Sequence, residues 1–121
     1  MGFFYSIRGW IEMDDEHLAQ VQRIVADDED GLDHYQQSWC FPTQGGGYSR
    51  FAFFGCTVRD SGVSRVRSQL ERIATRISSQ DGDITDYVHG IFHVTPEDDS
   101  REIVWLLHDG RFQESVHEHA A

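Results

Sequence analysis

Residues 86–114, DYVHGIFHVTPEDDSREIVWLLHDGRFQE, decide the fold of this chain. They contain two apolar runs, 87–94 and 103–107, on either side of a polar segment that holds Pro96 and three consecutive acids. Short runs of β-branched and aromatic residues around such a segment predict a β-hairpin. A second turn signal at 108–111 ends the hairpin, and one more short run follows. The residues expected at the hairpin tip are Glu97, Asp98 and Asp99.

The rest of the chain alternates between strand and helix patterns. Residues 3–13 place apolar and polar side chains on opposite sides with period two, which predicts a strand. Apolar residues at helical spacing predict one helix over 15–27 and a second over 61–78. Two further strands are expected at 34–42 and 48–59, and we interpret the three glycines between them as a turn.

This order of elements, β-α-β-β-α-β-β, predicts an α+β fold in a single domain over residues 1–121. We expect an antiparallel-dominated sheet of about five strands with both helices on one face. The nearest named architecture is the ferredoxin-like split β-α-β arrangement with an added strand. The 48–59 strand is apolar on both sides, with Phe51 and Phe53 on one and Ala52 and Phe54 on the other. We therefore expect it in the middle of the sheet, covered on both faces.

The charge balance is strongly negative, with 21 acidic residues against 10 basic ones and a net charge of −11. Nucleic acid and anionic membrane surfaces would be repelled, so we expect neither as a partner. A basic protein partner is the natural complement, although a general solubility surface or adaptation to high salt would give the same balance. Four arginines on the polar side of the second helix are interpreted as pairing with the acidic loops: Arg65, Arg67, Arg72 and Arg76.

The location and the redox state follow from what the sequence lacks. No apolar run approaches the ~20 residues that span a bilayer, and the N-terminus has no signal-peptide pattern, so we expect a cytoplasmic protein. Cys40 and Cys56 both sit in apolar runs and form no metal-binding pattern. Two reduced core thiols are expected, with a disulfide between strands as the alternative.

The candidate catalytic and metal-binding residues give weak signals. His89 and His93 would share one strand face but stand roughly 13 Å apart, too far to bind one metal ion. The segment 117–119, His-Glu-His, is interpreted as a frayed tail that would bind metal only loosely. No Gly-x-Ser-x-Gly elbow is present, and no Cys or Ser is marked as a nucleophile. The sequence thus predicts no enzyme activity, no cofactor and no metal.

A binding surface is the better interpretation of the remaining polar and aromatic residues. If the even-numbered side of the first strand faces outward, two predicted strands contribute to one sheet face wherever they adjoin. The residues of this face would be Arg8, Trp10 and Glu12 of the first strand and Tyr87, His89, Ile91 and His93 of the later one. Trp and Arg are residue types that anchor protein interfaces. The alternative is that a terminus or a loop covers Trp10.

Both ends of the chain resemble one protein family. Residues 5–11, YSIRGWI, resemble the aromatic-x-x-x-Gly-Trp opening of immunity family seven of bacterial polymorphic-toxin systems. The strand 87–94, the acidic turn that follows it, EIVW at 102–105 and GRF at 110–112 are similar to the closing pattern of that family. The middle of the chain agrees in layout only. The family usually has His before the first glycine, where this chain has Arg8. If Arg8 faces a partner, the toxin that is recognised could differ.

The resemblance implies a small cytoplasmic immunity protein, or antitoxin. Such a protein binds the toxic C-terminal domain of a cognate secreted effector and blocks it without catalysis. Many of these toxins are basic nucleases, so an acidic surface could occupy the cleft meant for phosphates. The acids that we consider for this role lie in two loops: Asp27, Asp28, Glu29 and Asp30 in the first, and Glu97, Asp98 and Asp99 in the second.

Two other functions fit the sequence less well. A small ferredoxin-like enzyme or ligand-binding domain would use the histidine-bearing face of the sheet, and a closed pocket lined by His89, His93 and Trp10 would favour it. A homodimer that packs sheet against sheet is the second alternative. An uncovered face without such a pocket would favour the protein binder.

Overall fold

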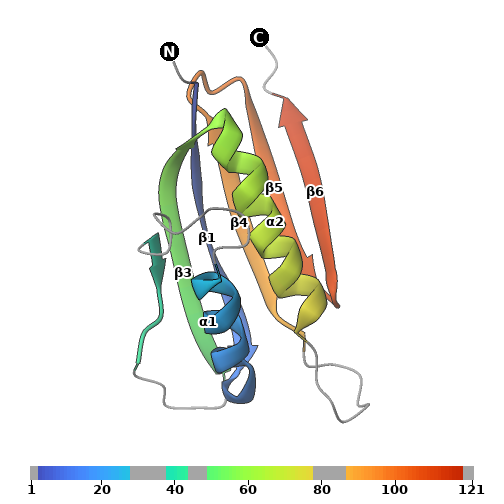
Figure 1. Ribbon diagram of the computed structural model, residues 1–121. Coiled ribbons are helices and arrows are strands. Elements are labelled where there is room, and N and C mark those ends of the chain that lie inside the picture. Colours follow the sequence, from blue (N-terminus) through green and yellow to red (C-terminus); the bar gives the residue numbers. More distant parts are fainter. Residues whose placement is uncertain (1–2, 28–37, 44–48, 78–86, 119–121) are drawn as a thin grey trace.

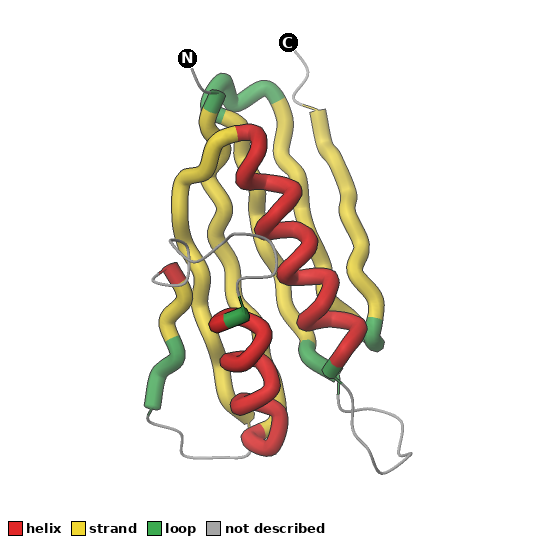
Figure 2. The backbone as a smooth tube through the Cα atoms, viewed as in Figure 1, coloured by secondary structure: helices red, strands yellow, loops and turns green. Residues whose placement is uncertain are grey.

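The computed structural model of the protein describes residues 3–27, 38–43, 49–77 and 87–118. Figure 1 shows that both helices of this described part lie on the same side of one sheet, and Figure 2 separates the helical layer from the strands by colour. In chain order the elements are β1 (Phe4–Asp14), the short 3-10 helix η1 (Asp15–His17), α1 (Leu18–Ala26), β2 (Trp39–Cys40), β3 (Ser49–Arg59), α2 (Asp60–Arg76), β4 (His89–Pro96), β5 (Arg101–His108) and β6 (Arg111–Glu118).

The sheet has the strand order β2-β3-β1-β4-β5-β6, and its neighbouring strands pair antiparallel. The helix α1 connects β1 to β2 with β3 between them, and α2 connects β3 to β4 with β1 between them. This is the split β-α-β arrangement expected from the sequence. The strands β5 and β6 extend the sheet beyond β4 as a meander, so the predicted α+β class with both helices on one face is confirmed.

The prediction of about five strands missed the sixth, β6. Its sequence, RFQESVHE, lacks apolar alternation, and every residue except the half-buried Phe112 is exposed. An edge strand with little buried surface carries little of the periodic signal by which strands are recognised. His117 and Glu118 belong to this strand, so their interpretation as a frayed tail is wrong. His119 lies outside the described residues.

The other element boundaries agree closely with expectation. The first helix begins with the 3-10 turn η1 before α1, and the second, α2, ends at Arg76. The strand expected over 34–42 is present at Trp39–Cys40, while 34–37 lie outside the described residues. Trp39 is buried and donates its indole N–H to Gln69 Oε1 of α2 at 3.0 Å. This bond ties the short strand to the helix layer.

The hydrophobic core lies between the helices and the sheet face that they cover. The periodicity predicted for α2 is confirmed, because its apolar residues at +4 and +3 spacing are fully buried. Side chains with no exposed surface come from both helices and from four strands, among them Val21, Val66, Leu70 and Ile73, and Ile7, Ile11, Ala52, Phe92, Val94 and Leu107.

The expectation that β3 is covered on both faces is wrong. Ala52 and Phe54 are buried under the helices, whereas Phe51 and Phe53 point to the other side and are exposed. No described element lies over that other side of the sheet. Apolar residues on both sides of β3 therefore mark one core face and one exposed apolar surface.

The arginines of α2 do not form one solvated stripe. Arg72 is only 8% exposed, so its placement on the polar side of the helix is wrong. Arg67 lies 3.5 Å from Glu71 on its own helix and 3.6 Å from Glu114 on β6. These contacts join α2 to the last strand, which extends the packing of the helix to the edge of the sheet.

Two glycines allow β1 and β4 to approach closely. Gly9 is paired with Phe92, and Gly90 is paired with Ile11. A Cβ at Gly9 would lie 2.6 Å from Phe92 Cδ2 and would overlap the carbonyl oxygen of Ile91, and a Cβ at Gly90 would lie 2.6 Å from Ile11 Cγ2. Each glycine is thus covered by a large side chain of the neighbouring strand.

The substitution Gly9→Ala tests this packing. The added methyl group has no room, so we expect a loss of about 1–3 kcal/mol in the free energy of unfolding, measured by urea titration. Gly55→Ala is the matched control, because Gly55 also lies in an inner strand and a Cβ there would meet nothing within 4 Å. Equal destabilisation by the two substitutions would contradict the proposed role of the close approach.

Candidate functional site

The sheet surface opposite the helices, called the open face below, carries an apolar row across four strands. Cross-strand pairing puts Trp10 of β1 between Phe53 of β3 and Ile91 of β4, and Ile91 is in turn paired with Leu106 of β5. The apolar row is therefore a line of directly paired residues: Phe53, Trp10, Ile91 and Leu106.

Large exposed apolar side chains are concentrated on this face. Phe53 is 45% exposed, and Phe51 packs beside the row, with its ring centroid 6.2 Å from that of Trp10. Of the large exposed apolar side chains in the described part of the chain, Val116 alone lies elsewhere, because its partner Ile103 faces the helices. A grouped apolar surface of this kind marks an interaction site more often than scattered single residues do.

Polar residues flank the apolar row on both sides. Arg8 is paired with His93 on one side of the row, and Glu12 is paired with His89 on the other. The structure thus brings together six of the seven residues that the sequence assigned to one face: Arg8, Trp10, Glu12, His89, Ile91 and His93. Tyr87 precedes β4. The alternative that a described loop covers Trp10 is excluded, because the indole is exposed.

The histidines of the open face find partners on β5 rather than each other. His93 Nδ1 lies 2.8 Å from Glu102 Oε1, and the ring of His89 lies 5.3 Å from the ring of His108. Sequence spacing excluded a shared metal ion for His89 and His93, and their separate partners agree with that. The cross-strand partners could not be read from the sequence, because they depend on the pairing of β4 with β5.

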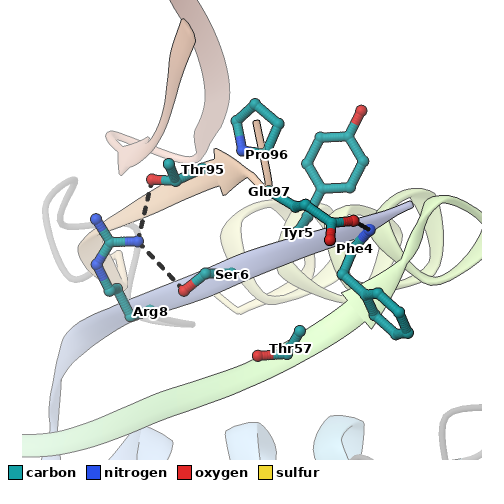
Figure 3. A pocket seen from close by; sticks show the side chains of 8 residues that line it. All are labelled: Phe4, Tyr5, Ser6, Arg8, Thr57, Thr95, Pro96 and Glu97. Carbon is teal, nitrogen blue, oxygen red and sulfur yellow. Dashed lines mark hydrogen bonds between the residues drawn. The ribbon is translucent and has the colours of Figure 1, made fainter. Parts of the chain in front are cut away.

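A pocket of about 300 Å³ lies at one end of the open face (Figure 3). Arg8 lies at one side of it and donates from Nη1 to Thr95 Oγ1 at 3.1 Å and to Ser6 Oγ at 3.4 Å. Glu97 lies at the other side and accepts a hydrogen bond from the backbone N–H of Phe4 at 3.1 Å. The residues that line the pocket are Phe4, Tyr5, Ser6, Arg8, Thr57, Thr95, Pro96 and Glu97.

This pocket is not the one expected on the histidine-bearing face, because His89, His93 and Trp10 are not part of it. Its polar lining consists of hydroxyl groups, the guanidinium of Arg8 and the carboxylate of Glu97. The hydrogen bonds of Arg8 go to hydroxyl oxygens of its own strand and of β4, which hold the guanidinium against the sheet. The arrangement is suited to presenting a positive charge beside the apolar row.

The acidic residues of the hairpin tip have structural roles. The backbone N–H of Ser100 donates to Asp98 Oδ1 at 3.0 Å. Hydrogen bonds from Ser100 lower the pKa of Asp98. Asp99 adopts a positive φ of 57°, a conformation that Asp tolerates better than most residues. These residues, together with Glu97, shape the turn at the end of the sheet.

Asp27 and the acidic hairpin tip lie apart in the fold. Asp27 follows the C-terminus of α1, whereas Glu97 contacts Phe4, the first residue of β1. The first helix follows the end of β1 that lies opposite Phe4. Asp27, at the end of that helix, therefore does not lie beside the hairpin tip. Asp28, Glu29 and Asp30 lie outside the described residues.

The two cysteines are free thiols, as predicted, but only one faces the core. Cys56 is paired with the buried Ile7 and is half-buried, and burial raises the pKa of its thiol. Cys40 is exposed and paired with Phe53 on the open face, so its assignment to the core is wrong. One thiol is therefore adjacent to the apolar row.

The fold and this surface define the protein as a small α+β sandwich in which no described element covers one face of the sheet. No family model, curated protein or solved structure matches the chain. In the described part, no helix is both long and apolar enough to cross a membrane.

Thiol reactivity tests the placement of the cysteines. We expect Cys40 to react rapidly with Ellman's reagent at pH 8 and Cys56 to react slowly, because a raised pKa leaves less thiolate at that pH. Replacement of Cys40 by Ser should remove the fast phase and leave the slow one. If the fast phase persists in that variant, the assignment is incorrect.

Proposed function

We propose that this chain is an immunity protein, which docks the open face on a cognate toxin domain and thereby blocks the toxin. The observation that carries the proposal is the apolar row. Trp and Phe with an adjacent Arg form the composition found at the centre of protein interfaces, where a few such residues supply most of the binding free energy.

The resemblance to immunity family seven supports the same surface. The first stretch that carries it, residues 5–11, lies in β1, and much of the second, residues 87–94, forms the adjacent strand β4. Together they contribute Trp10 and Ile91 to the apolar row. Two stretches that are far apart in the sequence therefore contribute to one surface.

Charge has a different role from the apolar row in this proposal. The charged side chains beside the row carry both signs, since Arg8 lies on one side and Glu12 on the other. The net charge of −11 belongs to the whole chain. Mixed charges near a contact set orientation, whereas net charge accelerates the approach of an oppositely charged partner. A basic toxin domain would thus be steered by the net charge and held by the row.

The exposed apolar row also favours a second candidate, a homodimer that packs open face against open face. Repulsion between two chains of net charge −11 opposes this association. Sedimentation of the protein at rising salt concentration distinguishes the two, because screening would promote self-association and weaken attraction to a basic partner.

The substitution Phe53→Ser tests the proposed interface. We expect at least a tenfold weaker Kd, or about 1.4 kcal/mol, for a toxin domain that co-purifies with the parent protein, measured by calorimetry. A pair of valines gives a matched comparison: Val104→Ser lies on the open face, and Val116→Ser lies on the other side of the sheet. Only the open-face member should weaken binding. Equal effects of the two valine substitutions, with both variants folded, would overturn the proposal.

Neutralising Asp27, Asp98 and Asp99 with Asn tests the contribution of charge. Asn keeps an acceptor for the Ser100 N–H and tolerates the positive φ at position 99. We expect slower association with the toxin domain and a weaker dependence of that rate on salt, with little change in dissociation. An unchanged rate and salt slope in stopped-flow measurements would show that these acids do not steer the partner.

A further inference from the structure

A second feature, independent of the proposed function, lies where β1 ends and the first helix begins. Asp14, Glu16 and His17 each bring one potential ligand atom to a common point, with all of these atoms within 4.8 Å of one another. His17 is only 2% exposed, and its Nε2 lies 3.6 Å from Glu16 Oε1. A buried imidazole thus points into a pair of carboxylates.

The local backbone produces this cluster. Asp14 has an extended conformation and occupies the N-cap position, but its side chain makes no capping hydrogen bond. The next three residues form the 3-10 turn η1. Side chains three residues apart are eclipsed in such a turn, which brings Asp14 and His17 to the same side. The carboxylate of Asp14 is therefore directed to the imidazole and not to the helix backbone.

Asp15, between the cluster residues, differs from them in having a basic partner. Its Oδ1 lies 2.8 Å from Nη1 of Arg50 on β3. Among the described residues, no arginine pairs with Asp14 or Glu16, and the ring of His17 makes no hydrogen bond. Two carboxylates without an arginine partner among the described residues and a buried ring nitrogen thus meet at one point.

We propose that Asp14, Glu16 and His17 bind a divalent first-row transition-metal ion of the Zn²⁺ type. One imidazole nitrogen and two carboxylate oxygens are ordinary zinc ligands, at about 2.0–2.2 Å from the metal. Two such ligands at a tetrahedral angle are about 3.4 Å apart, close to the 3.6 Å between His17 Nε2 and Glu16 Oε1. Ca²⁺ and Mg²⁺ prefer oxygen ligands alone, so the imidazole disfavours them.

The electrostatic balance of the site favours a cation. The N-terminus of a helix carries about half a positive charge, which by itself would repel a metal ion. The two carboxylates carry a full negative charge each and outweigh it. Three protein ligands leave a fourth position for water or for a ligand from a partner.

Zinc titration of the intact chain by calorimetry at pH 7 tests the site. Both His117 and His119 are replaced by Ala throughout, so that the C-terminal histidines do not contribute. We expect one Zn²⁺ per chain, and Asp14→Asn and Glu16→Gln should each weaken the affinity at least about tenfold. Asp15→Asn is the matched control and should bind as tightly as the parent, since Asp15 is directed to Arg50.

Thermal unfolding gives a second readout that does not depend on any partner. Zn²⁺ should raise the unfolding midpoint of the parent and of Asp15→Asn, and should leave that of Glu16→Gln unchanged. Glu16 is exposed, so this variant is expected to fold. Absence of zinc binding in the parent, or equal affinity in the parent, Asp14→Asn and Glu16→Gln, would overturn the proposal. Neither result bears on toxin binding.

Discussion

The close approach of β1 and β4 fixes which side chains form the core and which form the open face. Phe92 covers Gly9, and Ile11 covers Gly90, so both strands lose space if either glycine gains a side chain. Side chains alternate along a strand, and a shift of one residue would exchange the two faces. Such a shift would expose Ile11 and bury Trp10. The two glycine contacts therefore hold the register on which both the stability and the surface of the protein depend.

The same arrangement explains why none of the described elements covers the open face. The six strands make a sheet about 24 Å wide, and each helix is about 10 Å across. Two helices side by side are therefore wide enough to cover most of one face, and neither of them lies on the other face. The 17 residues of α2 span about 26 Å, enough to follow the sheet along its length. The apolar row is thus exposed because both helices of the described residues lie on the other face, and a binding partner would bury what these helices do not.

Much of the fold could be predicted because its signals are local. The spacing of Val66, Leu70 and Ile73 marks the buried side of α2, and the polar segment around Pro96 marks the turn between β4 and β5. The strand β6 could not be recognised in this way, since an exposed edge strand needs no apolar alternation. The covering of β3 was misjudged because apolar residues on both sides of a strand fit a second buried layer and an exposed binding surface equally well.

The two candidate sites differ in the same way, because one could be predicted from local sequence and the other could not. Arg8, Trp10 and Glu12 could be assigned to one face from alternation alone, and their neighbours on β4 followed once those strands were taken to adjoin. The cluster around His17 was missed because Asp14-Asp15-Glu16-His17 reads as an ordinary acidic helix start. The cluster differs from an ordinary helix start because the imidazole of His17 is buried and because Asp15 is paired with Arg50. Both features depend on tertiary packing.

The position of Asp14 connects the two proposed sites through one strand. Alternation along β1 places Asp14 in line with Trp10 and Glu12, so the proposed metal site lies where the open-face side of β1 ends. The register that exposes the apolar row also decides that the carboxylate of Asp14, and not the side chain of Met13, lies on this side. Met13 is buried beneath the helices for the same reason. One structural constraint, the pairing of β1 with its neighbours, therefore sets the core, the proposed docking surface and the proposed ligand set together.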